Sequence, residues 1–173
     1  MSMRLRSFAT LLAPLLVAAC AKKPPTAVVL LISSDLSFPA QANLVEIEVT
    51  RDGSTSFFKQ YPIPGGELKL PGTLVLQNDD TMDPAESVRV DIRALADATQ
   101  IVTRSAVFSM SDEKIKLLTM PLAAACKDVL CGQGRTCDLG ACVDEAVSSG
   151  DLPDFESNDA AFAGVGGAAG GKP

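Results

Sequence analysis

Cysteine is the residue of this 173-residue chain whose number and spacing most clearly predict chemistry. Four of its five cysteines lie close together near the C-terminus, separated by four, five and four residues: Cys126, Cys131, Cys137 and Cys142. The fifth, Cys20, stands alone near the N-terminus. Such thiols form disulfides, bind metal ions or accept covalent groups, and the compartment that the chain occupies decides among these fates.

The first twenty residues have the layout of a secretory signal. Arg4 and Arg6 precede an apolar run from Phe8 to Val17, and small residues close that run. This order of charged, apolar and small residues predicts a signal peptide over residues 1–19. The apolar run is shorter than the roughly 20 residues that a membrane-spanning helix needs, so we do not expect a permanent transmembrane helix there.

The end of this leader, Val17-Ala18-Ala19-Cys20, resembles the lipobox of bacterial lipoproteins. The resemblance implies that the Cys20 thiol receives a diacylglyceryl group, that cleavage precedes Cys20, and that the lipid anchors the chain in a membrane. Each buried CH2 of an acyl chain adds about 0.8 kcal/mol to such anchoring. An ordinary signal peptide followed by a chance cysteine is the alternative interpretation.

Two further features of this region bear on location. Ala21 stands where an aspartate usually marks retention in the inner membrane, so the resemblance implies a cell-envelope lipoprotein in the outer membrane of a Gram-negative bacterium. Residues 20–25 contain Pro24 and Pro25, and proline favours extended geometry. We therefore expect a short, stiff lipidated tether before the first domain.

The four C-terminal cysteines would meet an oxidising compartment after export, where disulfides are the expected state. A segment of this size has no core of its own and needs covalent links to hold a shape. A zinc site is the alternative, but zinc modules usually contain close Cys-x2-Cys pairs. Four cysteines allow three pairings, and spacing alone does not choose among them. Two disulfides within this set would leave Cys20 free for lipid.

The run from Cys126 to Cys142, and above all Cys131-Gly-Gln-Gly-Arg-Thr-Cys137, resembles the first half of an EGF-like module. The resemblance implies the pairs Cys126–Cys137 and Cys131–Cys142, because EGF-like modules join the first cysteine to the third and the second to the fourth. The last two cysteines of such modules have no counterpart here. The order of lipobox, β-domain and four-cysteine segment is also similar to uncharacterised lipoproteins of myxobacterial type, which implies no activity.

Composition excludes several kinds of site. The chain has no histidine and no tryptophan, which excludes Ser-His and Cys-His nucleophiles and histidine metal sites. Loss of residues 1–19 removes Arg4 and Arg6 and no acidic residue, so the formal charge changes from −6 to −8. Nucleic-acid binding, which draws on clustered Lys and Arg, is therefore not expected. The sequence indicates no cofactor and no small-molecule substrate.

Two acidic groups remain as candidate sites. Residues 78–83, Asn-Asp-Asp-Thr-Met-Asp, offer four candidate side chains with amide or carboxylate oxygens, and Ca²⁺ prefers such ligands, although the Asp-x-Asp-x-Asp-Gly order is absent. Glu46 and Glu48 lie two residues apart and could do acid–base work as paired carboxylates do in glycosidases. Their strand face is predicted to be solvent-exposed, and no sugar-stacking aromatics accompany them. A calcium-dependent module and an enzyme of unknown class stay as alternatives.

A β-rich domain over residues 26–122 must position these side chains. Apolar and polar residues alternate in Leu44–Thr50 and Val88–Arg93, as in strands with one buried face. Ala27–Ile32 is a β-branched apolar run of strand length, and Asp52-Gly53 predicts a tight turn. About seven or eight short strands fit this region. We predict an all-β fold, an antiparallel immunoglobulin-like sandwich in architecture, without the Cys-Trp-Cys core of antibody domains.

A small disulfide-stapled, EGF-like module over residues 126–142 is expected to follow the sandwich. Residues 146–173 are poor in apolar side chains, so we predict a disordered tail, with Leu152–Phe155 as a candidate docking motif. Secreted sandwiches and EGF-like units bind more often than they catalyse. We therefore expect a membrane-anchored envelope lipoprotein that acts as a binding or structural module, with an envelope protein as candidate partner.

Overall fold

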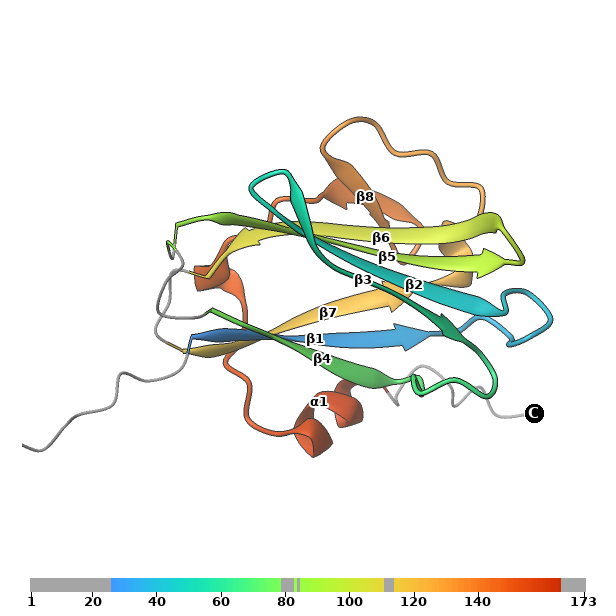
Figure 1. Cartoon of the computed structure of the whole chain (residues 1–173), viewed down its shortest axis with the longest axis horizontal. Helices are drawn as coiled ribbons and strands as arrows, with labels where there is room; N and C mark the ends of the chain where they lie inside the picture. The colour runs from blue at the N-terminus through green and yellow to red at the C-terminus, as the bar shows by residue number, and fades with distance from the viewer. Residues whose placement is uncertain (1–25, 79–82, 84, 111–113, 166–173) are drawn as a thin grey trace, which may run out of the picture.

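Two β-sheets pack face to face, with a smaller hairpin above one and a short helix below the other (Figure 1). This computed structural model describes residues 26–78, 83, 85–110 and 114–165. The strands are β1 (Ala27–Ser34), β2 (Leu44–Arg51), β3 (Ser54–Pro62), β4 (Gly72–Gln77), β5 (Ser87–Ala96), β6 (Thr99–Ser109), β7 (Ile115–Leu122), β8 (Arg135–Asp138) and β9 (Ala141–Asp144). The helices are the 3-10 turns η1 (Ala124–Cys126) and η2 (Ser149–Asp151) and the α-helix α1 (Asn158–Val165).

The strand order confirms the predicted all-β sandwich. One sheet has the order β4-β1-β7 and the other β3-β2-β5-β6. All neighbours are antiparallel except β1 and β7, which run parallel. Here β1 and β2 lie in different sheets, whereas the first two strands of constant-type immunoglobulin domains share one sheet. The architecture is therefore that of a sandwich, with a strand order of its own.

Alternation along the strands builds the core. On β2 the buried residues are Val45, Ile47 and Val49, which pair directly with buried Ala94, Ile92 and Val90 of β5. At the β2–β3 turn, Asp52 and Gly53 both have positive φ, as the Asp-Gly pair predicts. Because successive side chains alternate between faces, this pairing directs every second residue of the two strands into the space between the sheets.

The strand β1 does not alternate, because both of its faces are covered. Val28, Leu30 and Ile32 belong to the core between the sheets. Val29 and Leu31 point the other way and are still buried, at 2% and 1% exposure. The helix α1 lies on that side of the sheet, as Figure 1 shows, and a central strand covered on both faces reads as a continuous apolar run.

The segment before this helix corrects the prediction of a disordered tail from residue 146. Val107 donates its N–H to Glu145 O at 2.7 Å and accepts from Val147 N at 2.8 Å, which extends the free edge of β6. Leu117 donates to Pro153 O at 2.9 Å, and Phe155 donates to Ile115 O at 2.8 Å, which extends β7. We call residues 145–155 the edge-capping segment. Residues 166–173 lie outside the described ranges.

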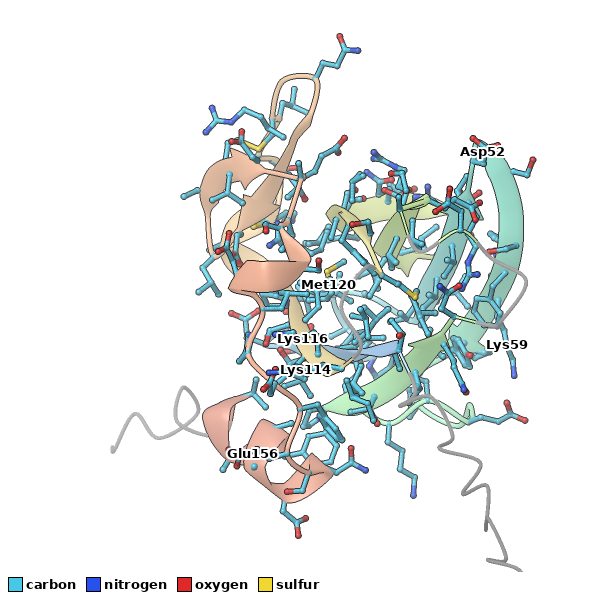
Figure 2. All side chains as sticks on the ribbon, turned by 90° about the vertical axis from the view of Figure 1, so that its left-hand side faces the viewer. Asp52, Lys59, Lys114, Lys116, Met120 and Glu156 are labelled. Atoms are coloured by element: carbon cyan, nitrogen blue, oxygen red, sulfur yellow. A yellow bond between two sulfur atoms is a disulfide. The ribbon has the colours of Figure 1, made fainter. Side chains whose placement is uncertain are left out.

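Order arises here without a hydrophobic run because backbone pairing and ion pairs hold the segment. Asp154 accepts from Lys116 at 2.9 Å and from Lys114 at 3.0 Å, and Figure 2 shows both lysines beside this part of the chain. Leu152 is 8% exposed, so the candidate docking motif 152–155 packs on its own chain. A single segment's composition does not reveal such pairing with a distant strand edge.

Candidate binding site between the sandwich and the disulfide module

Residues 126–142, the disulfide module, contain two disulfides. Cys126 bonds Cys137 and Cys131 bonds Cys142, with Cα–Cα distances of 5.7 and 5.6 Å. This is the pairing that the EGF-like resemblance implied. The zinc alternative fails for these four residues, because their sulfur atoms are used in covalent bonds and are not thiolates.

The module is attached firmly to the sandwich. Cys126 and Cys137 are 4% and 6% exposed and belong to the same buried cluster as the sandwich core. Thr136 Oγ1 accepts the N–H of Ser105 at 2.8 Å in a buried hydrogen bond, which places the β8–β9 hairpin against the free edge of β6. The module and the start of the edge-capping segment therefore cover consecutive parts of that edge.

A buried arginine makes a second link between the two parts. Arg104 pairs with Ile92 across β5 and β6, which places its side chain on the apolar face of the sheet. Its Nη2 lies 3.5 Å from Asp138 Oδ2, and its Nε and Nη1 have no hydrogen-bond partner in the described structure. Burial lowers the pKa of Arg104, with Asp138 acting in the opposite direction.

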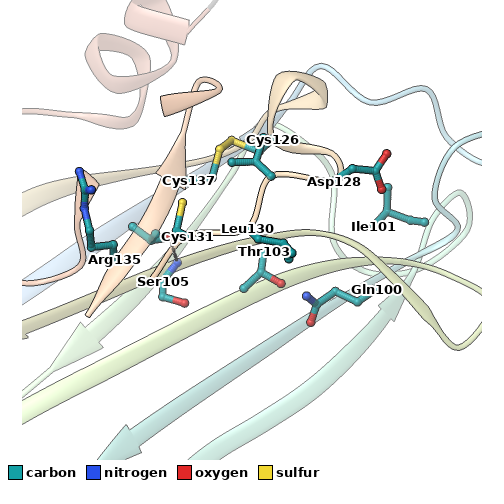
Figure 3. A pocket seen from close by; sticks show the side chains of 12 residues that line it. Gln100, Ile101, Thr103, Ser105, Cys126, Asp128, Leu130, Cys131, Arg135 and Cys137 are labelled. Atoms are coloured by element: carbon teal, nitrogen blue, oxygen red, sulfur yellow. Dashed lines mark hydrogen bonds between the residues drawn. A yellow bond between two sulfur atoms is a disulfide. The ribbon is translucent and has the colours of Figure 1, made fainter. Parts of the chain in front are cut away.

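Between β6 and the module lies a cavity of about 330 Å³. Figure 3 shows its two walls, one from the outward-facing residues of β6 and the other from the first loop and the hairpin of the module. The volume lies at the lower end of the range for small-ligand sites. The lining residues are Gln100, Ile101, Thr103, Ser105, Cys126, Asp128, Val129, Leu130, Cys131, Arg135, Thr136 and Cys137.

The strand wall of the cavity is irregular and has unmet hydrogen-bonding capacity. Pairing with β5 shifts register here, with Val102 opposite Ala94 but Gln100 opposite Leu95, so Ile101 is the extra residue of a β-bulge. Such bulges are over-represented next to active sites. Thr103 follows, and its Oγ1 is buried with no partner among the described residues. A buried unpaired hydroxyl is costly, so Thr103 lowers the stability of this wall.

The two ends of the cavity carry opposite charges. Asp128 lies toward the Ile101 end and Arg135 toward the Ser105 end, as the labelled side chains of Figure 3 show. Arg135 donates one hydrogen bond to Cys142 O, which orients the guanidinium along the hairpin. Asp128 has a positive φ of 62°, a conformation that few non-glycine residues adopt.

The outer face of the four-stranded sheet carries an ion network, which corrects the predicted solvent-exposed face of Glu46 and Glu48. Their side chains are 12% and 25% exposed, because Arg93 lies between them and donates hydrogen bonds of 2.7 and 2.9 Å. The hydrogen bond from Gln60 lowers the pKa of Glu46; partial burial opposes this, and Arg93 adds to it. Burial works against the charged form of Arg93, but bonds to these carboxylates raise its pKa.

The same network reaches the cavity wall. Asp91 is 7% exposed and accepts the hydroxyl of Ser105 at 2.5 Å. Arg89 bonds Asp91 and Glu145, at 2.8 Å each, and these bonds raise its pKa. Glu145 begins the edge-capping segment, so one arginine joins the sheet face to the chain that leaves the module. The network therefore holds the cavity wall in place at Ser105. This structural role is clearer than any role as a reactive group.

Other sequence-predicted sites fall partly outside the described ranges. Cys20 and the leader do so entirely, and the candidate calcium loop keeps only Asn78 and Asp83. Within the described residues, no group of three or more cysteine and acidic side chains could hold a metal ion. That part of the chain also contains no helix with the length and hydropathy needed to cross a membrane.

Comparison with known proteins adds no identity. No family model, curated protein or solved structure matches this chain. The cavity must therefore be interpreted from its own geometry and chemistry.

Sequence reasoning did not identify the cavity residues Thr103, Asp128 and Arg135. Each belongs to a residue type common on solvated strands and loops, so none stands out in one sequence. A signal was present one residue away: Arg104 interrupts the otherwise apolar positions Val102, Ala106 and Phe108 of β6. A charge on the buried face of a strand predicts a partner outside the sheet, and that partner is Asp138.

Proposed function

We propose that this chain is an exported lipoprotein, held in the cell envelope by lipid on Cys20, that presents a disulfide-braced binding site to another envelope protein. The observation that carries the proposal is the position of the cavity. Its β6 wall, from Gln100 to Ser105, occupies the part of that strand remote from the start of β1.

The strand connections establish that position. Ala27 at the start of β1 pairs with Ile115, and β6 ends at Ser109, shortly before Ile115. Ile101 is at the other end of β6, which is about 26 Å away at about 3.3 Å per residue. Figure 1 shows the start of β1 at one end of the sandwich and the β5–β6 turn at the other. A short tether would therefore place the first end near the membrane and the cavity away from it.

The cysteines support export independently of the leader. Structural disulfides persist in oxidising compartments and are rare where thiols are kept reduced. The pairs Cys126–Cys137 and Cys131–Cys142 form a closed set, so Cys20 is the odd cysteine of five. A free exported thiol on the last residue of a lipobox-like sequence is what lipid attachment requires.

Catalysis is less well supported than binding. A carboxyl group that acts as a general acid near neutral pH needs a raised pKa. The pKa of Glu46 is instead lowered by its hydrogen bonds from Gln60 and Arg93. Both oxygens of the Glu46 carboxylate accept hydrogen bonds from protein side chains, so neither points freely at a substrate.

The anchor is tested by Cys20→Ser, expressed with its leader in a Gram-negative host. The parent protein should fractionate with membranes and have the mass of residues 20–173 plus acyl groups; the variant should lose both properties. Cys131→Ser/Cys142→Ser is the matched control, because it removes cysteines but should keep the lipid. Membrane retention and acyl mass in Cys20→Ser would overturn the proposal.

A further inference from the structure

We propose that the cavity between β6 and the disulfide module binds an extended peptide segment as an added strand on the free edge of β6. This inference rests on the proposed binding function and names its ligand class. It does not depend on the lipid anchor.

The free edge of β6 is covered only in part by its own chain. Alternate residues of a strand direct their N–H groups to the same side. Val107 uses that side to bond Glu145 O, and Ser105 uses it to bond Thr136 Oγ1. Thr103 is the next residue in this series, and no hydrogen bond to its N–H is found among the described residues. The cavity opens at this uncovered position.

The backbone of Thr103 is unpaired at this position. Its N–H and C=O both point to the open edge, and no hydrogen bond to either group is found among the described residues. A peptide backbone supplies both a carbonyl acceptor and an N–H donor at strand spacing, so an added strand would satisfy them together. A rounded apolar ligand would leave both groups unpaired and is disfavoured.

The opposite wall supports a strand rather than a bulky ligand. Val129 and Leu130 line it, together with the Cys126–Cys137 and Cys131–Cys142 bridges. These groups suit one or two apolar side chains that alternate from an extended backbone. A volume of about 330 Å³ accommodates only a short segment of this kind.

The charges at the two ends add a requirement on the peptide. Asp128 at the Ile101 end attracts a basic side chain, and Arg135 at the Ser105 end attracts a carboxylate. The expected ligand is therefore a short extended segment with an apolar middle and opposite charges at its ends. Charge placement of this kind contributes to specificity and register.

The probes are two blocked pentapeptides, Lys-Val-Thr-Val-Glu and its reverse, Glu-Val-Thr-Val-Lys, one for each strand direction. We would add each to the mature lipoprotein in detergent micelles, with threonine labelled by ¹⁵N, and record amide shifts. One of the two peptides should shift Thr103 and Thr136, which line the cavity, and leave Thr55 and Thr119 unchanged. The same peptide with N-methyl groups on its backbone should bind at least tenfold more weakly.

The matched variant is Thr103→Pro, which removes the N–H on the open side of an edge strand, where proline is tolerated. Thr103→Val keeps this N–H and is the control. Thr103→Pro should weaken peptide binding about fivefold, whereas Thr103→Val should keep the affinity of the parent and, by removing a buried unpaired hydroxyl, raise the Tm of the free protein. Parent affinity in Thr103→Pro would overturn the inference.

Other outcomes separate this inference from the proposed function. If neither peptide shifts Thr103 at millimolar concentration, or if the N-methylated form binds equally well, strand addition is wrong while the lipid anchor on Cys20 stands. If the parent chain, exported with its leader, carries no lipid but binds the peptide, the anchor is wrong and the peptide site stands.

Discussion

At the scale of the residue, Arg104 shows how a charge can lie on a buried strand face. Its side chain is 7% exposed, and its nearest acidic partner, Asp138, is 34% exposed at 3.5 Å. Removing Asp138 leaves the buried guanidinium without a compensating charge, whereas removing Arg104 leaves only a carboxylate that is partly exposed and can be hydrated. The two residues should therefore respond to substitution in opposite ways.

We expect Asp138→Asn to lower the free energy of unfolding by about 2 kcal/mol, less than for a fully buried pair because Asp138 is partly exposed. Arg104→Met should leave it unchanged or raise it by about 1 kcal/mol, since methionine fills irregular space without a charge to desolvate. Urea denaturation under oxidising conditions measures both. Equal destabilisation by the two variants would mean that Arg104 contributes through packing and not through its charge.

Leu139 offers a second test at this scale. It has a positive φ of 49°, it precedes Gly140 in the β8–β9 turn, and it is 72% exposed. Left-handed backbone costs most residues about 1–2 kcal/mol, and asparagine tolerates it better than leucine. Leu139→Asn should therefore raise the free energy of unfolding by about 0.5–1 kcal/mol. Leu130→Asn is the control, because Leu130 is 95% exposed and has no positive φ. The free energy of unfolding of this variant should equal that of the parent.

At the scale of the element, alternation and turn residues predicted the sandwich well. The predicted strands Leu44–Thr50 and Val88–Arg93 correspond to β2 and β5, within three residues at each end. The exposed face assigned to Glu46 and Glu48 was wrong, because Arg93 comes from a strand distant in sequence. Contacts between segments far apart in the chain have no signature in either segment alone, and the cavity is made entirely of such contacts.

The edge-capping segment should respond to acid through Asp154. Hydrogen bonds from Lys116, and then from Lys114, lower the pKa of this carboxyl below its usual value, and slight desolvation opposes them. A carboxyl with a lowered folded-state pKa stabilises the folded arrangement above its unfolded pKa, and this contribution is lost as the pH falls through the lowered value. Hydrogen exchange of the Leu117 and Phe155 amides, corrected for intrinsic rate, should therefore increase below about pH 4.

Two variants separate this effect from general acid unfolding. Asp154→Asn should show faster exchange at the Leu117 amide at neutral pH and little further change in acid. Glu67→Gln is the control, because Glu67 also pairs with a lysine and has a lowered pKa, but its partner Lys59 lies on β3, in the other sheet from β7. Unchanged exchange at neutral pH in Asp154→Asn would contradict the role assigned to Asp154.

At the scale of the whole molecule, the C-terminal third completes a sandwich that would otherwise be left open. Beyond the disulfide module, the chain covers the free edge of β6 and crosses to the free edge of β7, and its last described residues, in α1, lie on the outer face of β1. Uncovered edge strands pair readily with other chains. Val29 and Leu31 would also lose their cover, and each fully buried apolar side chain contributes about 1.5–3 kcal/mol.

A chain that ends at Asp144 should therefore have a lower Tm and self-associate at micromolar concentration, as measured by calorimetry and light scattering. A chain that ends at Val165 keeps the edge-capping segment and α1 and should behave like the parent. The disulfides should still form in both, because all four cysteines precede the truncation. If the shorter chain stayed monomeric with the parent Tm, the residues after 144 would be dispensable for edge protection. The covered parts of the β6 edge would then be no better protected than the open position at Thr103.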